Sequence, residues 1–167
     1  MLIAVASGKG GAGKTTVAVS LAAMLAREHS VHLLDCDVEA PNAGIFLRPA
    51  IDASGPVMRP VPVVDAALCD LCGQCSAACR FHAVATTSSR VLVFPDLCHG
   101  CGACLRACPR GAIAERLVAV GEVRSGRAGS IRFTEGRLNT GATATVQVIR
   151  EVRRKESPAE FVIRDAP

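Results

Sequence analysis

Eight of the nine cysteines follow a single spacing that occurs twice in the chain. Each copy reads C-x2-C-x2-C-x3-C, and the copies are Cys69, Cys72, Cys75 and Cys79, then Cys98, Cys101, Cys104 and Cys108. The surrounding segments, Leu68–Val84 and Leu97–Ile113, align at a constant offset of 29 residues. Internal repetition of this kind indicates a pseudo-two-fold module formed by duplication.

This cysteine spacing is typical of proteins that hold two [4Fe–4S] clusters. The first three cysteines of a motif bind one cluster, and the fourth binds the other. The implied ligand sets are Cys69, Cys72, Cys75 and Cys108 for cluster 1, and Cys98, Cys101, Cys104 and Cys79 for cluster 2. A structural zinc site and disulfides are the alternatives, but zinc usually requires two C-x2-C pairs separated by a longer knuckle. His82 and His99 are expected to be surrounding or surface groups rather than ligands.

A second motif, Gly8-x-x-x-x-Gly13-Lys14-Thr15, matches the phosphate-binding loop of nucleotide-binding proteins. Glycines let successive backbone N–H groups turn toward phosphate oxygens, and the following helix adds its positive N-terminal end. Lys14 is expected to contact the β- and γ-phosphates, and the Thr15 hydroxyl to bind Mg²⁺. The predicted nucleotide-binding residues are Gly8, Gly10, Gly11, Ala12, Gly13, Lys14, Thr15 and Thr16.

The segments around the loop predict a strand–helix–strand unit, and therefore an α/β fold with a parallel sheet. Leu2–Ala6 is expected to be a buried, central strand and Val31–Asp35 a second strand. Lys14–Glu28 has helical spacing, with Val17, Leu21, Met24 and Leu25 able to share one face.

The remaining segments have distinct patterns. Arg48–Val64 is rich in proline and indicates a linker, whereas Leu117–Leu138 predicts a β-hairpin or meander. Thr145–Lys155 is expected to be a helix with a basic exposed face, and Glu160–Asp165 a short strand.

Five segments together resemble the MinD/ParA/Mrp superfamily of P-loop ATPases, in the form that contains an inserted ferredoxin domain. They are "SGKGGAGKTT", "DCDVEAPN", "VFPDLCHGCGACLRACP", "GRLNTG" and "VIRDAP". The resemblance implies a P-loop ATPase domain over residues 1–59, a ferredoxin-like domain with two [4Fe–4S] clusters over 60–116, and a continuation of the ATPase domain over 117–167. The family continues beyond such a chain, so we expect an incomplete sheet and either a fragment or a truncated gene.

The same resemblance implies roles for individual residues. Lys9, Lys14 and Asp37 would be catalytic: Lys9 would reach the partner's phosphate across a nucleotide-sandwiched homodimer, and Asp37 would orient the attacking water. Asp35 and Asp165 would lie near Mg²⁺, directly or through water, together with Thr15. The alternatives are a surface lysine at Lys9 and a turn or helix-capping aspartate at Asp37.

The resulting functional prediction is an ATPase that couples its nucleotide state to electron transfer through two [4Fe–4S] clusters, with a redox partner protein. The alternative is an iron–sulfur cluster carrier of the Mrp type, and a positioning ATPase on membrane or DNA is a third possibility. Hydrolysis of ATP is expected of a full-length protein and is doubtful for 167 residues alone.

Composition also limits which partners and which cellular location are expected. Five Phe, no Trp and no Tyr leave few rings on which bases could stack, so nucleic acid is an unlikely partner. No apolar run reaches the roughly 18 residues of a membrane span. The N-terminal residues lack the features of a signal peptide, so the protein is expected to be cytoplasmic. Thiols stay reduced in the cytoplasm, so nine cysteines there indicate metal binding rather than disulfides.

Overall fold

A computed structural model describes residues 1–8 and 11–167 of the chain. The predicted site residues Lys9 and Gly10 therefore lie outside the described residues. The chain divides into two compact units. Unit 1 comprises Met1–Val57, Val120–Thr140 and Ala144–Pro167, and unit 2 comprises Met58–Ala119 and Gly141–Thr143.

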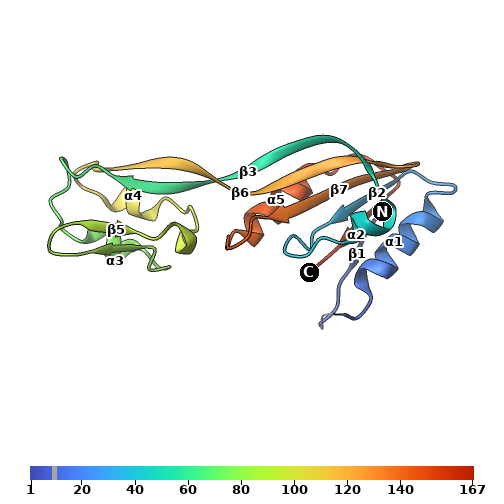
Figure 1. Cartoon of the computed structure of the whole chain (residues 1–167), viewed down its shortest axis with the longest axis horizontal. Helices are drawn as coiled ribbons and strands as arrows, with labels where there is room; N and C mark the ends of the chain where they lie inside the picture. The colour runs from blue at the N-terminus through green and yellow to red at the C-terminus, as the bar shows by residue number, and fades with distance from the viewer. Residues whose placement is uncertain (9–10) are drawn as a thin grey trace. The chain divides into compact units, whose positions relative to one another are not determined.

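Unit 1 is built on a sheet whose strand order is β1-β8-β2-β7-β6-β3 (Figure 1). The strands are β1 (Leu2–Val5), β8 (Phe161–Asp165), β2 (Val31–Asp35), β7 (Ile131–Leu138), β6 (Ile113–Ala128) and β3 (Ala50–Val64). β1, β8, β2 and β7 run parallel, and β6 runs antiparallel to β7. The predicted α/β class with a mostly parallel sheet is confirmed.

The predicted central position of the first strand is wrong. β1 pairs only with β8 and lies at the edge of the sheet, where Leu2 is 53% exposed. An apolar run indicates that a strand suits a buried environment, but it does not specify the neighbours of that strand. Those neighbours come from residues far away in the sequence.

Helix α1 (Lys14–Leu25) covers one face of this sheet through its alanines. Ala18 and Ala22 are fully buried in a core that includes Leu33, Phe133 and Ile163. Of the four residues expected to share a face, Val17 and Met24 are exposed, so that part of the prediction is wrong. Alanine has no side chain beyond Cβ, so the helix backbone lies close to the sheet and larger residues flank the contact.

Helix α5 (Thr145–Arg154) packs on the opposite face, where Gly121 and Gly136 have no side chain that would clash with it. A Cβ on Gly136 would lie 2.6–2.9 Å from methyl groups of Val38, Val148 and Val152. Phe133 faces α1 and Gly136 faces α5, as expected for residues three apart on a strand. The predicted helix at Thr145–Lys155 is confirmed to within one residue.

The predicted linker Arg48–Val64 is instead largely a strand, β3. Prolines at positions 56, 60 and 62 caused the error, because proline cannot donate to a sheet ladder. β3 is the last strand in the sheet order. The three prolines are separated by even numbers of residues, so in a regular strand the N–H groups that they lack would all lie on the same side. The predicted hairpin over Leu117–Leu138 is confirmed by antiparallel β6 and β7.

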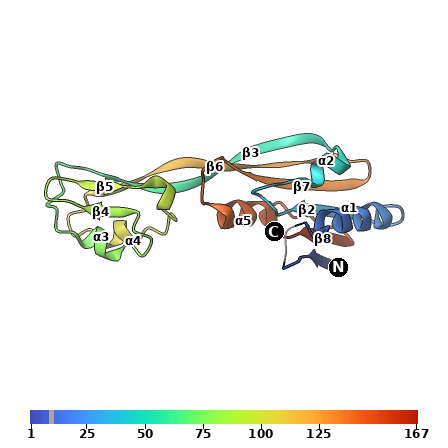
Figure 2. The same ribbon diagram turned by 60° about the horizontal axis from the view of Figure 1, so that its bottom comes forward.

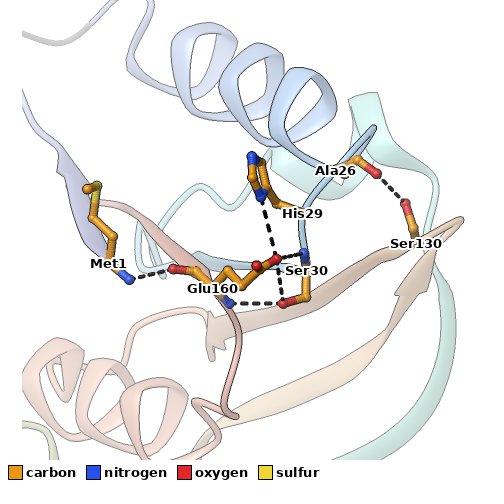
Figure 3. Close-up of polar contacts among 6 residues, drawn as sticks. All are labelled: Met1, Ala26, His29, Ser30, Ser130 and Glu160. Carbon is orange, nitrogen blue, oxygen red and sulfur yellow. Dashed lines mark hydrogen bonds and ion pairs between the residues drawn. The ribbon is translucent and has the colours of Figure 1, made fainter.

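Polar contacts join the amino-terminal ends of three strands (Figure 3). The Ser30 N–H donates to Glu160 Oε2 (2.8 Å), and the Glu160 N–H donates to Ser30 Oγ (2.9 Å). The amino group of Met1 donates to the Glu160 carbonyl, and His29 pairs with the Glu160 carboxylate. These bonds fix the register of β1, β2 and β8, whose carboxyl ends carry the candidate site.

Unit 2 repeats its backbone conformation as well as its cysteines. Helices α3 (Gln74–Ala78) and α4 (Ala103–Ala107) are 29 residues apart and pack against each other (Figure 2). The other elements are the antiparallel strands β4 (Val84–Thr86) and β5 (Val91–Val93) and the short helix η1 (Pro95–Leu97). Left-handed residues recur at the same offset, in the pairs Leu71 and Gly100, Gly73 and Gly102, and His82 and Gly111.

Candidate functional site

The glycine loop connects β1 to the N-terminus of α1. Gly11 and Gly13 have φ values of 75° and 83°, a region that favours glycine. Lys14 and Thr15 are the first residues of α1, where free N–H groups and the helix dipole favour an anion. Apart from their chain neighbours, no described residue has an atom within 4 Å of a Cβ built on Gly8, Gly11 or Gly13.

Two carboxylates lie side by side at the carboxyl ends of neighbouring strands, near this loop. Asp35 ends β2 and Asp165 ends β8, and the register pairs them directly. Both side chains are fully buried. Sequence reasoning placed both near Mg²⁺, and the parallel sheet brings them to one edge.

The Asp35 carboxylate accepts three backbone hydrogen bonds. Oδ1 accepts from the N–H of Asp37 (3.1 Å), and Oδ2 accepts from the N–H groups of Asn42 (3.0 Å) and Ala43 (2.9 Å). Burial nevertheless raises the pKa of Asp35 to about 6, with the charge of Asp165 adding to the effect. Asp35 therefore shapes the turn that carries Asp37.

The Asp165 carboxylate is different, because both of its oxygens are buried and no backbone N–H of the described residues donates to either of them. Burial raises its pKa, and the charge of Asp37 adds to the increase, while Thr15 and Lys14 oppose it. The Lys14, Thr15 and Asp37 side chains therefore all act on the Asp165 carboxylate. The buried Asp165 carboxylate, with the Thr15 hydroxyl beside it, fits a hard divalent cation such as Mg²⁺.

Unit 2 contains a cavity lined by four cysteines from both copies of the repeat. Cys69, Cys72 and Cys75 come from the first motif and Cys108 from the second. Val64, Val91 and Ile113 supply apolar lining, and Asp70 and Arg110 also line the cavity.

A second cavity is lined by the complementary set of thiols. Cys98, Cys101 and Cys104 come from the second motif and Cys79 from the first. Phe81 and His99 also line it, with ring centroids 3.7 Å apart and an interplanar angle of 19°. Cys75, Cys98 and Cys104 are buried, whereas Cys72 and Cys101 are exposed at equivalent positions.

Backbone N–H groups point at the sulfur atoms of both cavities. The Ala83 N–H donates to Cys79 Sγ and the Ala112 N–H to Cys108 Sγ, each at 3.3 Å. All nine cysteines are free, and no three His, Cys, Asp or Glu groups among the described residues are arranged to hold a single metal ion. A [4Fe–4S] cubane binds each thiolate through a different iron, so its ligands stand farther apart than those of one ion. Four thiols around each apolar cavity fit such a cluster.

The structure also brings together residues that sequence reasoning missed. Arg110 Nε donates to Asp70 Oδ2 (2.8 Å), and the Asp70 pKa is lowered to about 2 by Arg110 and by the hydrogen bonds to Cys72. Glu135 is buried within β7 and pairs with Arg124 (3.3 Å) and Arg137 (3.0 Å). The sequence contained one signal for the Asp70–Arg110 pair: at the repeat offset of 29, Asp70 is equivalent to His99 and Phe81 is equivalent to Arg110. The contacts of Glu135 with its two arginines depend on strand register, which no local pattern encodes.

Comparison with known proteins identifies the family of the chain. A model of the CobQ/CobB/MinD/ParA nucleotide binding domain matches residues 3–165. The chain belongs to this family. Membership in the CobQ/CobB/MinD/ParA family agrees with the mostly parallel sheet and with the glycine loop at the N-terminus of α1.

Individual relatives of this CobQ/CobB/MinD/ParA domain match over shorter stretches. An uncharacterized protein of Methanocaldococcus jannaschii is 34% identical over 88 residues, which is 50% of this chain and 30% of the relative. An iron-sulfur cluster carrier protein of Pseudomonas fragi is 53% identical over 46 residues, 27% of this chain and 16% of the relative. An Arabidopsis thaliana protein named as an iron-sulfur protein required for mitochondrial NADH dehydrogenase is 51% identical over 49 residues, 28% and 16%. The matched stretches therefore span less than a third of these relatives.

Within residues 1–8 and 11–167, none of the helices combines the length and the apolar character needed to cross a bilayer.

Proposed function

We propose that the chain is the nucleotide-binding part of an ATPase in which an inserted ferredoxin-like module, predicted at residues 60–116, holds two [4Fe–4S] clusters. The ligand sets are Cys69, Cys72, Cys75 and Cys108 for one cluster, and Cys98, Cys101, Cys104 and Cys79 for the other. The observation that supports this most strongly is the exchange of the fourth cysteine between the two motifs around the two cavities. A duplicated module with exchanged ligands is typical of two-cluster ferredoxins.

The nucleotide site consists of the glycine loop, Lys14, Thr15 and the two strand-end carboxylates. Bound Mg²⁺ would neutralise charge on the phosphates, with Thr15 and Asp165 holding it directly or through water. Asp37 would orient the attacking water, and Lys9 of a second copy would complete the site in a nucleotide-sandwiched homodimer. ATP hydrolysis by this pair would alternate the dimer between closed and open states.

Electron transfer between the clusters and a redox partner protein is the use that the cysteine cavities favour. Buried thiols and backbone N–H groups aimed at sulfur suit clusters that stay in place while they change oxidation state. The nucleotide cycle would then control which partner the clusters reach.

The relatives favour a second candidate, an iron–sulfur cluster carrier. Several of them are named as carriers, and the names support this alternative better than electron transfer. A carrier releases its cluster to an acceptor protein, whereas an electron-transfer protein keeps it.

Anaerobic reconstitution with iron and sulfide tests the common part of the proposal. About eight iron atoms per chain are expected, four for each cluster. Cys79→Ser and Cys108→Ser should each reduce the count by about half, while Cys36→Ser, outside both motifs, should leave it unchanged. Stable binding of zinc in place of iron would contradict the proposal.

The two candidate functions differ in the fate of the iron. For electron transfer, dithionite bleaches the visible absorption, reoxidation restores it, and an apo-acceptor removes no iron. For a carrier, iron moves to the apo-acceptor at a rate that changes with Mg-ATP. In either case Lys14→Ala should abolish Mg-ATP binding and Lys155→Ala, a lysine outside the loop, should preserve it.

A further inference from the structure

The two cysteine cavities are closed by chemically different contacts at equivalent positions. At the repeat offset of 29 residues, Asp70 in the first copy is equivalent to His99 in the second, and Phe81 is equivalent to Arg110. The first cavity has the Asp70–Arg110 ion pair, and the second has the stacked Phe81–His99 pair. All four residues line the cavity that their pair adjoins.

Each pair joins the two chain segments that supply one cavity with its cysteines. Asp70 lies in the three-cysteine loop, and its Oδ1 accepts the N–H of Cys72 (3.2 Å). Arg110 lies two residues after Cys108, which is the cavity's fourth cysteine. In the second cavity His99 lies in the three-cysteine loop, and Phe81 lies two residues after Cys79.

We propose that these pairs are clasps that keep each cluster in its cavity, and that the ionic clasp makes the Cys69–Cys72–Cys75–Cys108 site the salt-sensitive one. This inference rests on the proposed function, because it assigns positioning roles around the proposed clusters. Opening a clasp separates the loop with three ligands from the segment with the fourth. The Asp70 and Arg110 side chains are 37% and 62% exposed, so salt and water compete with their pairing. The contact between Phe81 and His99 is a ring stack, which salt screens less than an ion pair.

The rate of iron release to a chelator is measured on chains loaded with both clusters. Each site then accounts for half of the total iron released. Raising the salt to about 1 M should accelerate release of one half by roughly two- to five-fold, the range expected for loss of an exposed ion pair, and accelerate release of the other half much less. Asp70→Asn retains an oxygen for the Cys72 N–H but removes the charge. It should release the same half equally fast at low salt and show no further response to salt.

Exchange of the clasps separates positioning from a general effect on folding. The double variant with Asp70→His and Arg110→Phe installs the aromatic clasp in the first cavity, and it should restore slow release without salt dependence. The converse double variant, with Phe81→Arg and His99→Asp, should make both halves salt-sensitive. Equal acceleration of both halves in wild type, or unchanged release from Asp70→Asn, would overturn the proposal.

A double-mutant cycle of urea unfolding with Asp70→Asn and Arg110→Gln tests the ion pair without iron. Coupling between the two substitutions is expected at low salt, and its absence would contradict the clasp. A chain that shows this coupling but takes up no iron would instead contradict the proposed function, and with it the role of the clasp.

Discussion

Asp35 and Asp165 face each other across neighbouring parallel strands, and both carboxyl groups are fully buried. Burial raises the pKa of each. The pKa of Asp35 reaches about 6, with the charge of Asp165 adding to the increase, and the charge of Asp37 adds to the increase at Asp165. Three backbone N–H groups stabilise Asp35, whereas no backbone N–H of the described residues donates to Asp165, whose charge is stabilised by the nearby Thr15 hydroxyl and Lys14. The sheet edge therefore contains a destabilising charge arrangement that a bound cation would relieve.

Asp165→Asn should stabilise the protein in the absence of metal and nucleotide. At neutral pH the substitution removes a buried charge, which is worth about 1–3 kcal/mol of unfolding free energy. Saturating Mg-nucleotide should raise the melting temperature of wild type and fail to raise that of the variant. Thermal unfolding with and without Mg-nucleotide measures both effects. A variant less stable than wild type without metal would contradict this account of the site.

His32 should make the protein less stable in weak acid. The Ser157 N–H donates to His32 Nδ1 (3.1 Å), so Nε2 carries the proton and donates to Thr134 Oγ1 (3.0 Å). Burial lowers the pKa of this histidine below 6.5. The unfolded chain then binds more protons, so stability is complete above about pH 6.5 and declines as the pH falls toward the folded-state pKa.

Urea unfolding between about pH 8 and 5 measures this effect. The His32→Gln variant lacks the titrating ring, so wild type should lose more stability than the variant over that interval. The raised pKa values of Asp35 and Asp165 act in the opposite direction in both proteins and cancel in the comparison. Parallel curves would show that His32 does not contribute.

Gly136→Ala should destabilise unit 1 by overpacking. The new methyl would lie 2.6–2.9 Å from three valine side chains, including Val148 of α5. Overpacking of this kind costs about 1–3 kcal/mol. Adding Val148→Ala should recover part of the loss, so that the double variant is more stable than the sum of the single changes predicts. Chemical unfolding of the four proteins measures the coupling, and strict additivity would exclude the contact.

His82 and Gly111 occupy equivalent left-handed positions in the two repeats, and substitutions at the two positions should change the free energy of unfolding in opposite directions. Gly111 has φ 61° with no atom within 4 Å of a Cβ, so Gly111→Ala should cost about 1–2 kcal/mol through the backbone alone. His82 has φ 52° at the equivalent position, and His82→Gly should be neutral or stabilising by up to about 1 kcal/mol. Unfolding of iron-loaded protein compares the two, and equal destabilisation by both would contradict this explanation.

Much of the nucleotide-binding unit could be predicted because its signals are local. The glycine loop, the strand ending at Asp35 and the helix at Thr145 depend on residues close together in the sequence. The errors concern β1, which is an edge strand, and β3, whose prolines suggested a linker. Both depend on which strands pair across long sequence separations, and no local pattern specifies that.

The sequence alone determined the duplication of the cysteine motif, the expected exchange of Cys79 and Cys108, and the phosphate-binding loop, because fixed spacings encode them. Only the tertiary structure decided that Asp165 is buried with no backbone hydrogen bond from the described residues, and that Asp70–Arg110 lines one cavity where Phe81–His99 lines the other. Burial and pairing arise when distant segments pack together, so they depend on three-dimensional neighbours rather than on any residue's position in the chain.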